Sequence, residues 1–107
     1  MHLNELQQYV KAWIEEIGET NWTKWNYFSR LVEEVGEVGE QLSLSEGVKR
    51  HKSFDKAQLE EELGDILFVL AALSNELGID LETAFEMMRA KHKRKFGDID
   101  RALTGDR

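Results

Sequence analysis

The chain has 107 residues, of which 41% are hydrophobic, so it is long enough for one compact domain with a modest core. Its 14 Lys and Arg against 21 Asp and Glu give a net charge of −7, which disfavours generic binding to nucleic acid or to an anionic membrane and means that a polyanionic substrate would need cations as intermediaries. The absence of cysteine excludes disulfides and thiolate metal sites and fits the cytoplasmic location that we expect.

The first predicted element is an amphipathic helix. Proline is absent, although average usage would give about five, so helices lack their strongest breaker and an all-α fold of four helices is expected. Apolar residues recur at helical spacing over residues 3–17, and Gly18 is placed to end this helix in a left-handed turn. The segment is acidic rather than basic, so we expect no signal peptide.

The second predicted helix is capped by Thr20 or Asn21 and ends near Leu44. Residues 45–53 then form a loop, whose basic run at 49–52 is interpreted as solvated. The apolar stripe expected to face the core consists of Trp25, Phe28, Leu31, Val32, Val35, Val38 and Leu42.

The third predicted helix starts near Asp55 and is closed by Gly78. From Ile66 to Leu73 it is apolar on nearly every side, which indicates burial within a bundle or an oligomer. We therefore expect a homo-oligomer that associates through apolar helix faces, with a homodimer and a homotetramer both open.

The fourth predicted helix is capped by Asp80, has a basic end at residues 89–95 and stops at Gly97. Residues 98–107 are expected to form a loosely ordered tail. With no repeat, linker or low-complexity segment, residues 1–107 are interpreted as a single domain. No run of residues is apolar enough to span a bilayer, so no membrane partner is expected.

Two pairs of acids stand out on the second and third helices. Positions three apart on a helix differ by roughly 60° around its axis, so Glu34 with Glu37, and Glu62 with Asp65, each share a face. Both pairs lie on apolar stripes, where an uncompensated carboxylate costs several kcal/mol. The spacing predicts that these four residues together form a site for divalent cations.

The ligand chemistry of this site favours Mg²⁺, because Mg²⁺ prefers oxygen ligands and keeps water and substrate phosphates in its shell. No EF-hand loop supports Ca²⁺, and no ExxH pattern supports a di-iron bundle. Three glycines stand beside the acids in helix interiors, where each costs roughly 1 kcal/mol relative to Ala, and close helix approach is the expected compensation. They are Gly36, Gly39 and Gly64.

The segments LVEEVGEVGEQL at residues 31–42 and EEELGDILFVL at residues 60–70 resemble the MazG-like, all-α nucleoside triphosphate pyrophosphohydrolases, whose signature is EExxE followed by ExxD. The resemblance covers about residues 1–96. It implies a MazG-like helical bundle in which Mg²⁺, or Mn²⁺ as a substitute, is held by Glu34, Glu37, Glu62 and Asp65. The implied reaction cleaves a nucleoside triphosphate into the monophosphate and pyrophosphate.

The resemblance also implies substrate-binding residues. Lys91 corresponds to a phosphate-binding lysine, while both Lys95 and the adjacent Arg94 stay open for the family's arginine. Trp22 and Trp25 are candidates to hold the base, whereas Trp13 lies on the core stripe of the first helix and is interpreted as packing.

Glu33 shares the motif but falls about 100° from Glu34, so we expect it to orient or deprotonate the attacking water as a catalytic residue, with a surface acid as the alternative. Two further hypotheses stay open for the whole chain. One is a regulatory helical module that binds cations or nucleotide without turnover, and the other is a purely structural bundle. The preferred base and sugar are not predicted by any spacing.

Overall fold

The computed structural model describes residues 1–47 and 53–98, and within this part the chain is built from helices without any strand. The helices are α1 (Leu3–Ile17), α2 (Lys24–Ser45), α3 (Lys56–Glu76) and α4 (Leu81–Phe96). The all-α class and the four helices are therefore confirmed. The expectations for the basic run at 49–52 and for most of the tail lie outside the described residues. None of the described helices is both long enough and apolar enough to cross a bilayer.

Most helix ends lie where the sequence places them. Gly18 ends α1 in the left-handed region at φ 78°, while Asp55 and Asp80 each cap a helix by accepting a backbone N–H with the side chain. The predicted cap of α2 is wrong. Thr23 accepts from the Asn26 backbone, and the Asn26 side chain accepts from the Thr23 N–H at 2.8 Å, a reciprocal pair that satisfies two free donors at once.

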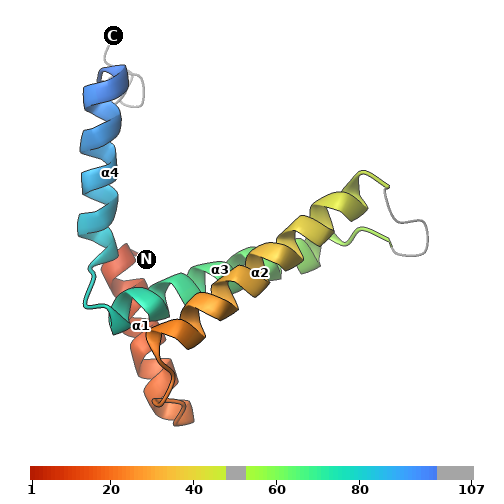
Figure 1. Ribbon diagram of the computed structural model, residues 1–107, viewed down its shortest axis with the longest axis horizontal. Helices are drawn as coiled ribbons and strands as arrows, with labels where there is room; N and C mark the ends of the chain where they lie inside the picture. The colour runs from red at the N-terminus through yellow and green to blue at the C-terminus, as the bar shows by residue number, and fades with distance from the viewer. Residues whose placement is uncertain (48–52, 99–107) are drawn as a thin grey trace.

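The helices α2 and α3 form a long antiparallel hairpin, and α1 crosses it near the start of α2 and the end of α3 (Figure 1). The apolar core lies at this crossing, where α1 is covered by both partners. Its buried members are Val10, Tyr27, Val69, Ala71 and Ala72, with Leu6, Ile14, Leu31, Phe68, Leu73 and Leu81 packed around them.

The fourth helix departs from the rest of the chain. It packs against α1 near its own start and then extends away from the α2–α3 hairpin, so that none of its residues is buried (Figure 1). A closed bundle of four helices is therefore not formed within one chain.

A buried glutamine fixes the turn from which α4 departs. The Gln7 side chain donates to the Ile79 carbonyl at 2.7 Å and to Asn75 Oδ1 at 3.1 Å, and its Oε1 accepts from the Leu81 N–H at 2.8 Å. Asn75 in turn donates to the Gln7 carbonyl at 2.9 Å. Because these bonds join α1 to both sides of the turn, they set the direction of α4.

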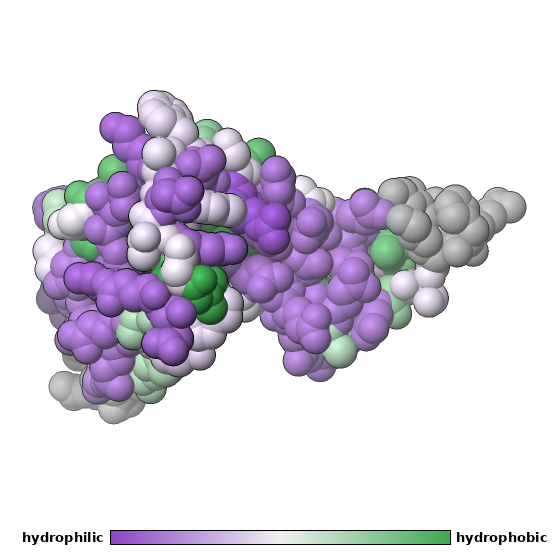
Figure 2. Space-filling model, turned by 90° about the horizontal axis from the view of Figure 1, so that it is seen from below, coloured by the Kyte–Doolittle hydropathy of each residue, from purple (hydrophilic) through white to green (hydrophobic). Residues whose placement is uncertain are grey.

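Much of the apolar surface predicted to be core is exposed in the single chain. Figure 2, seen from below, shows a mainly hydrophilic face on the arm formed by α2 and α3. Elsewhere on the two helices large apolar side chains are solvent-exposed, namely Trp25, Phe28, Val32, Val35 and Leu42 of α2 and Leu63, Leu67 and Leu70 of α3. Large apolar side chains exposed along two paired helices are typical of proteins that bury them against another molecule.

The explanation offered for the three interior glycines is not supported within the chain. A Cβ built on Gly36, Gly39 or Gly64 would meet no atom within 4 Å, so close approach of α2 and α3 does not require glycine there.

The Gln7 contacts give a stability prediction. Gln7→Leu leaves the Leu81 N–H and the Ile79 carbonyl without their partners, so we expect a loss of about 2–4 kcal/mol in the free energy of unfolding, measured by urea denaturation. Gln8→Leu, at an exposed neighbouring position on the same helix, is the matched control and should change it by less than about 0.5 kcal/mol. Equal effects in the two variants would contradict this account of the turn.

Candidate functional site

The antiparallel pairing of α2 and α3 brings carboxylates from the two helices together. One carboxylate oxygen from each of Glu34, Glu62 and Asp65 lies within 4.8 Å of the other two. Glu34 comes from the middle of α2, and Glu62 and Asp65 share one face of α3 because they are three residues apart. Three acids at this spacing repel one another unless protons or cations compensate their charge.

Glu34 is the most buried of these acids, with 3% of its surface exposed. Its Oε1 forms an ion pair with the Arg30 Nε at 3.1 Å, while its Oε2 is buried without a hydrogen-bond partner. The Glu62 Oε2 is likewise buried without a donor. A buried oxygen without a partner is costly, so these two atoms are suited to a ligand that the chain itself does not supply.

Glu37 extends the cluster along α2, one turn beyond Glu34, and is more exposed. Its carboxylate shares a hydrogen bond with Glu62, and this contact, followed by burial and by Glu34, raises the pKa of Glu62 to about 7. Hydrogen bonding between two carboxyl groups requires a proton. Without cations, Glu62 therefore keeps a proton up to near-neutral pH.

The donors of this cluster fit a hard divalent cation. All of the possible ligand atoms are carboxylate oxygens, which Mg²⁺ prefers and softer metals do not. Two buried oxygens, one each on Glu34 and Glu62, also receive no hydrogen bond from the protein. The candidate ligands are Glu34, Glu62 and Asp65, with Glu37 beside them.

A cleft of about 720 Å³ opens beside the acids, and Glu34 and Asp65 form part of its wall. Its other walls are largely aromatic. Trp13 meets Phe68 edge to face with ring centroids 5.6 Å apart, and Trp22 meets Tyr27 at 5.4 Å. Aromatic walls next to a carboxylate cluster suit a ligand with a flat ring at one end and a cation-binding group at the other.

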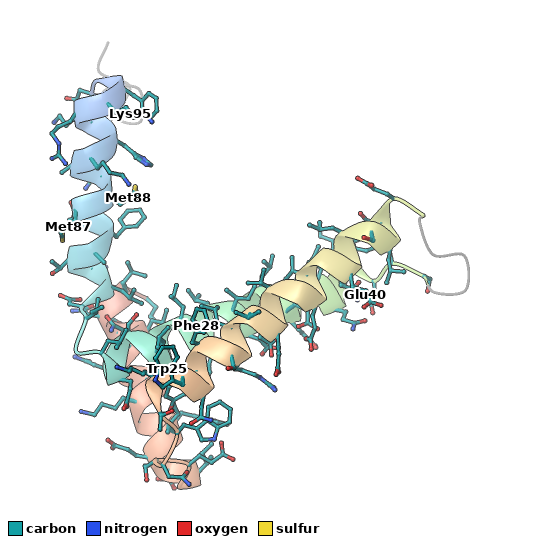
Figure 3. The ribbon with its side chains drawn as sticks, viewed as in Figure 1. Trp25, Phe28, Glu40, Met87, Met88 and Lys95 are labelled. Carbon is teal, nitrogen blue, oxygen red and sulfur yellow. The ribbon has the colours of Figure 1, made fainter. Side chains whose placement is uncertain are left out.

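Of the tryptophans predicted to contact a base, only Trp22 lines this cleft. Trp25 is 68% exposed on another side of α2, where it contacts Phe28, so the structure does not bring it to the site (Figure 3). Trp13, interpreted as core packing, lines the cleft and is 45% exposed. Trp13 lies one turn beyond the fully buried Val10, and its ring meets Phe68 of α3 edge to face while the rest of it faces the cleft.

Glu33 lies beside the cluster but outside it. Its carboxylate is exposed and lies 3.6 Å from an Arg30 terminal nitrogen, and it does not line the cleft. Glu33 thus points away from the buried Glu34 toward solvent, while its catalytic role stays a prediction.

The basic residues predicted to bind phosphates do not meet the carboxylates within one chain. Lys91, Arg94 and Lys95 are all exposed on α4, and Lys95 lies near the outer end of this helix, far from the hairpin (Figure 3). The physical reason is that α4 packs on α1 and not on α2. Their positive charges interact favourably with the C-terminal end of the helix dipole, whether or not they also bind phosphate.

Most residues that line the cleft were not predicted as site residues, and four of them bear on its chemistry, namely Trp13, Tyr27, Arg30 and Phe68. Trp13 and Phe68 lie in apolar patterns that predict core packing and give no separate signal, and Tyr27 lies outside the predicted stripe of the second helix. Arg30 did give one, because a residue four positions before Glu34 shares its face of the helix.

Comparison with known proteins agrees with this geometry. Residues 23–97 match the MazG nucleotide pyrophosphohydrolase domain, which includes both acid motifs. The uncharacterized protein YpjD of Bacillus subtilis is 36% identical over 100 residues, spanning 92% of this chain and 88% of YpjD. The nucleoside triphosphate pyrophosphohydrolase of Escherichia coli K12 is 31% identical over 80 residues, which are 75% of this chain but 29% of that enzyme.

The fold gives the same result. A crystal structure of the Bacillus-conserved MazG protein, a nucleotide pyrophosphohydrolase, matches with a TM-score of 0.70 and 34% sequence identity, covering 85% of this chain and 88% of that one. Sequence and fold thus agree over most of the chain, including both helices that carry the acids. The chain belongs to the MazG family of nucleotide pyrophosphohydrolases, which are hydrolases acting on nucleotide pyrophosphate bonds.

Proposed function

We propose that this protein is a Mg²⁺-dependent pyrophosphohydrolase that cleaves a nucleoside or deoxynucleoside triphosphate into the monophosphate and pyrophosphate. The observation that carries the proposal is the carboxylate cluster of Glu34, Glu62 and Asp65 at the wall of an aromatic cleft. The E. coli relative is named a nucleoside triphosphate pyrophosphohydrolase, which supports the same reaction here.

The two ends of the cleft match the two ends of such a substrate. The aromatic walls formed by Trp13 and Trp22 offer stacking surfaces for a nucleobase. The acids at the other wall repel phosphates unless cations lie between them, as the net charge of −7 also requires. The nucleotide is therefore oriented with its base among the aromatic side chains and its phosphates toward α3.

The chain's own residues mainly bind and orient. Glu34, Glu37, Glu62 and Asp65 would hold Mg²⁺, which supplies charge neutralisation at the phosphate oxygens and acidifies water when bound. Glu33 is placed at the edge of the cluster, from which it orients the attacking water or accepts its proton.

Association of copies is part of the proposal. Exposed apolar side chains line α2 and α3, and the basic end of α4 extends away from its own carboxylates. A homodimer or homotetramer would bury these apolar side chains. It would also let Lys91, Arg94 or Lys95 of one copy reach the phosphates bound by another copy. A solution mass of one chain, 12.4 kDa, would contradict this part.

The reaction is tested by measuring pyrophosphate release across a panel of common and modified triphosphates in Mg²⁺ and Mn²⁺. Loss of a residue that only supports a metal ligand typically costs roughly 10- to 100-fold in activity. We expect Glu62→Gln to lower kcat by more than this, because it removes a carboxylate ligand itself. Glu60→Gln, on the same helix and exposed, should stay active. Nucleotide binding without release from folded protein would instead indicate a regulatory module.

The two tryptophans of the α2 region give a matched pair. Trp22→Ala should raise KM roughly 5- to 100-fold, since stacking of one base on an aromatic ring contributes about 1–3 kcal/mol. Trp25→Ala removes the same side chain outside the cleft and should leave the KM of the assembled enzyme unchanged. Equal increases in KM would show that the base is bound elsewhere.

The raised pKa of Glu62 gives a pH prediction. A carboxyl group whose pKa is higher in the folded state than its usual 4.5 favours folding at low pH, and this contribution is lost as the pH rises through about 7. In EDTA, the melting temperature should therefore fall more steeply between about pH 4.5 and pH 7 in the wild type than in Glu62→Gln. The stabilisation by Mg²⁺ should grow over the same range, because binding displaces the proton. If the melting temperatures of the two proteins in EDTA changed equally with pH, the raised pKa of Glu62 would be contradicted.

A further inference from the structure

Arg30 occupies a position between the carboxylates and the aromatic cleft. Its Nε forms an ion pair with Glu34 Oε1 at 3.1 Å, and a terminal nitrogen lies 3.6 Å from Glu33. The side chain also forms part of the cleft wall, together with Tyr27 one turn earlier on the same helix. About half of its surface is exposed, so the guanidinium has room to move.

The charges around the cleft make Arg30 distinctive. Its described lining residues include the acids Glu19, Glu34 and Asp65, and among them Arg30 is the one cation. The basic residues of α4 are separated from this cleft within the chain. An anionic ligand entering the cleft therefore meets a single positive side chain that belongs to the cleft itself.

A cation at the unpaired Oε2 of Glu34 would weaken the pairing of Arg30 with the same carboxylate. A divalent cation on Glu34 would lie close to the guanidinium, and two positive charges at short range repel one another. Arginine side chains in helices lean toward the preceding turn, which here carries Tyr27 and faces the cleft. The guanidinium released from Glu34 thus has a position available beside the ligand.

We propose that Arg30 is a substrate-binding residue, whose guanidinium leaves Glu34 when a divalent cation binds there and then contacts the phosphates of the nucleotide. This inference rests on the proposed function for its ligand. Guanidinium groups bind phosphate through two parallel N–H bonds, which an ammonium group does not reproduce. In the empty cleft, the same side chain acts as the counter-ion of Glu34.

Two affinities should change in opposite directions when Arg30 is replaced. Arg30→Gln removes a competitor of the cation, so the Mg²⁺-dependent rise in melting temperature, measured without nucleotide, should occur at a lower Mg²⁺ concentration. At saturating Mg²⁺, binding of a triphosphate analogue with a non-hydrolysable α–β linkage, measured by calorimetry, should weaken roughly 10- to 100-fold. In Arg30→Lys, the affinity for the analogue should lie between those of the wild type and Arg30→Gln.

Arg89→Gln is the control, because Arg89 also pairs with a glutamate on its own helix, Glu86 at 3.0 Å, but lies on α4 outside the cleft. It should change neither affinity. An unchanged affinity for the analogue in Arg30→Gln, or a parallel loss of Mg²⁺ and analogue binding, would overturn the proposal. Since binding and not turnover is measured, a wild type that binds the analogue but releases no pyrophosphate refutes the proposed reaction while the Arg30 comparison still stands.

Discussion

The antiparallel contact between α2 and α3 is the constraint on which the rest of the molecule depends. It places acids that are 28 or more residues apart in the chain, Glu34 opposite Glu62 and Asp65, with oxygens within 4.8 Å. Such proximity opposes folding through charge repulsion and unpaired buried oxygens. The apolar crossing with α1, centred on Val10, supplies the opposing stabilisation next to the site. A cation at the cluster would relieve the repulsion that the packing imposes.

The helices and the acid cluster were predictable because they depend on local rules. Capping chemistry at Asp55 and Asp80 and the left-handed turn at Gly18 fix helix ends from nearby residues alone. The three-residue spacing of Glu62 and Asp65 likewise fixes a shared face. Thr23 was overlooked as a cap because its partner, Asn26, is not the Glu or Gln usually sought three residues on.

The cleft and the direction of α4 were not predictable from periodicity. A helical stripe shows which residues share a face, but it does not show which neighbour covers each part of that face. Trp13 and Val10 belong to one stripe, yet Val10 is fully buried and Trp13 is half exposed at the cleft. Trp25 also follows its stripe and lies in solvent. Similarly, the course of α4 depends on the side-chain bonds of Gln7, which has no apolar periodicity to reveal it.

One helix serves both regions, since α1 carries Trp13 at the cleft and Gln7 at the turn that precedes α4, about 9 Å apart along its axis. These two attachments connect α1 to the aromatic cleft at one point and to α4 at the other. The 16 residues of α4 span about 24 Å, so a tilt of about 5° transmitted through the Gln7 bonds would displace its far end by roughly 2 Å. Any tilt of α1 on filling of the cleft would therefore also move the basic end of α4.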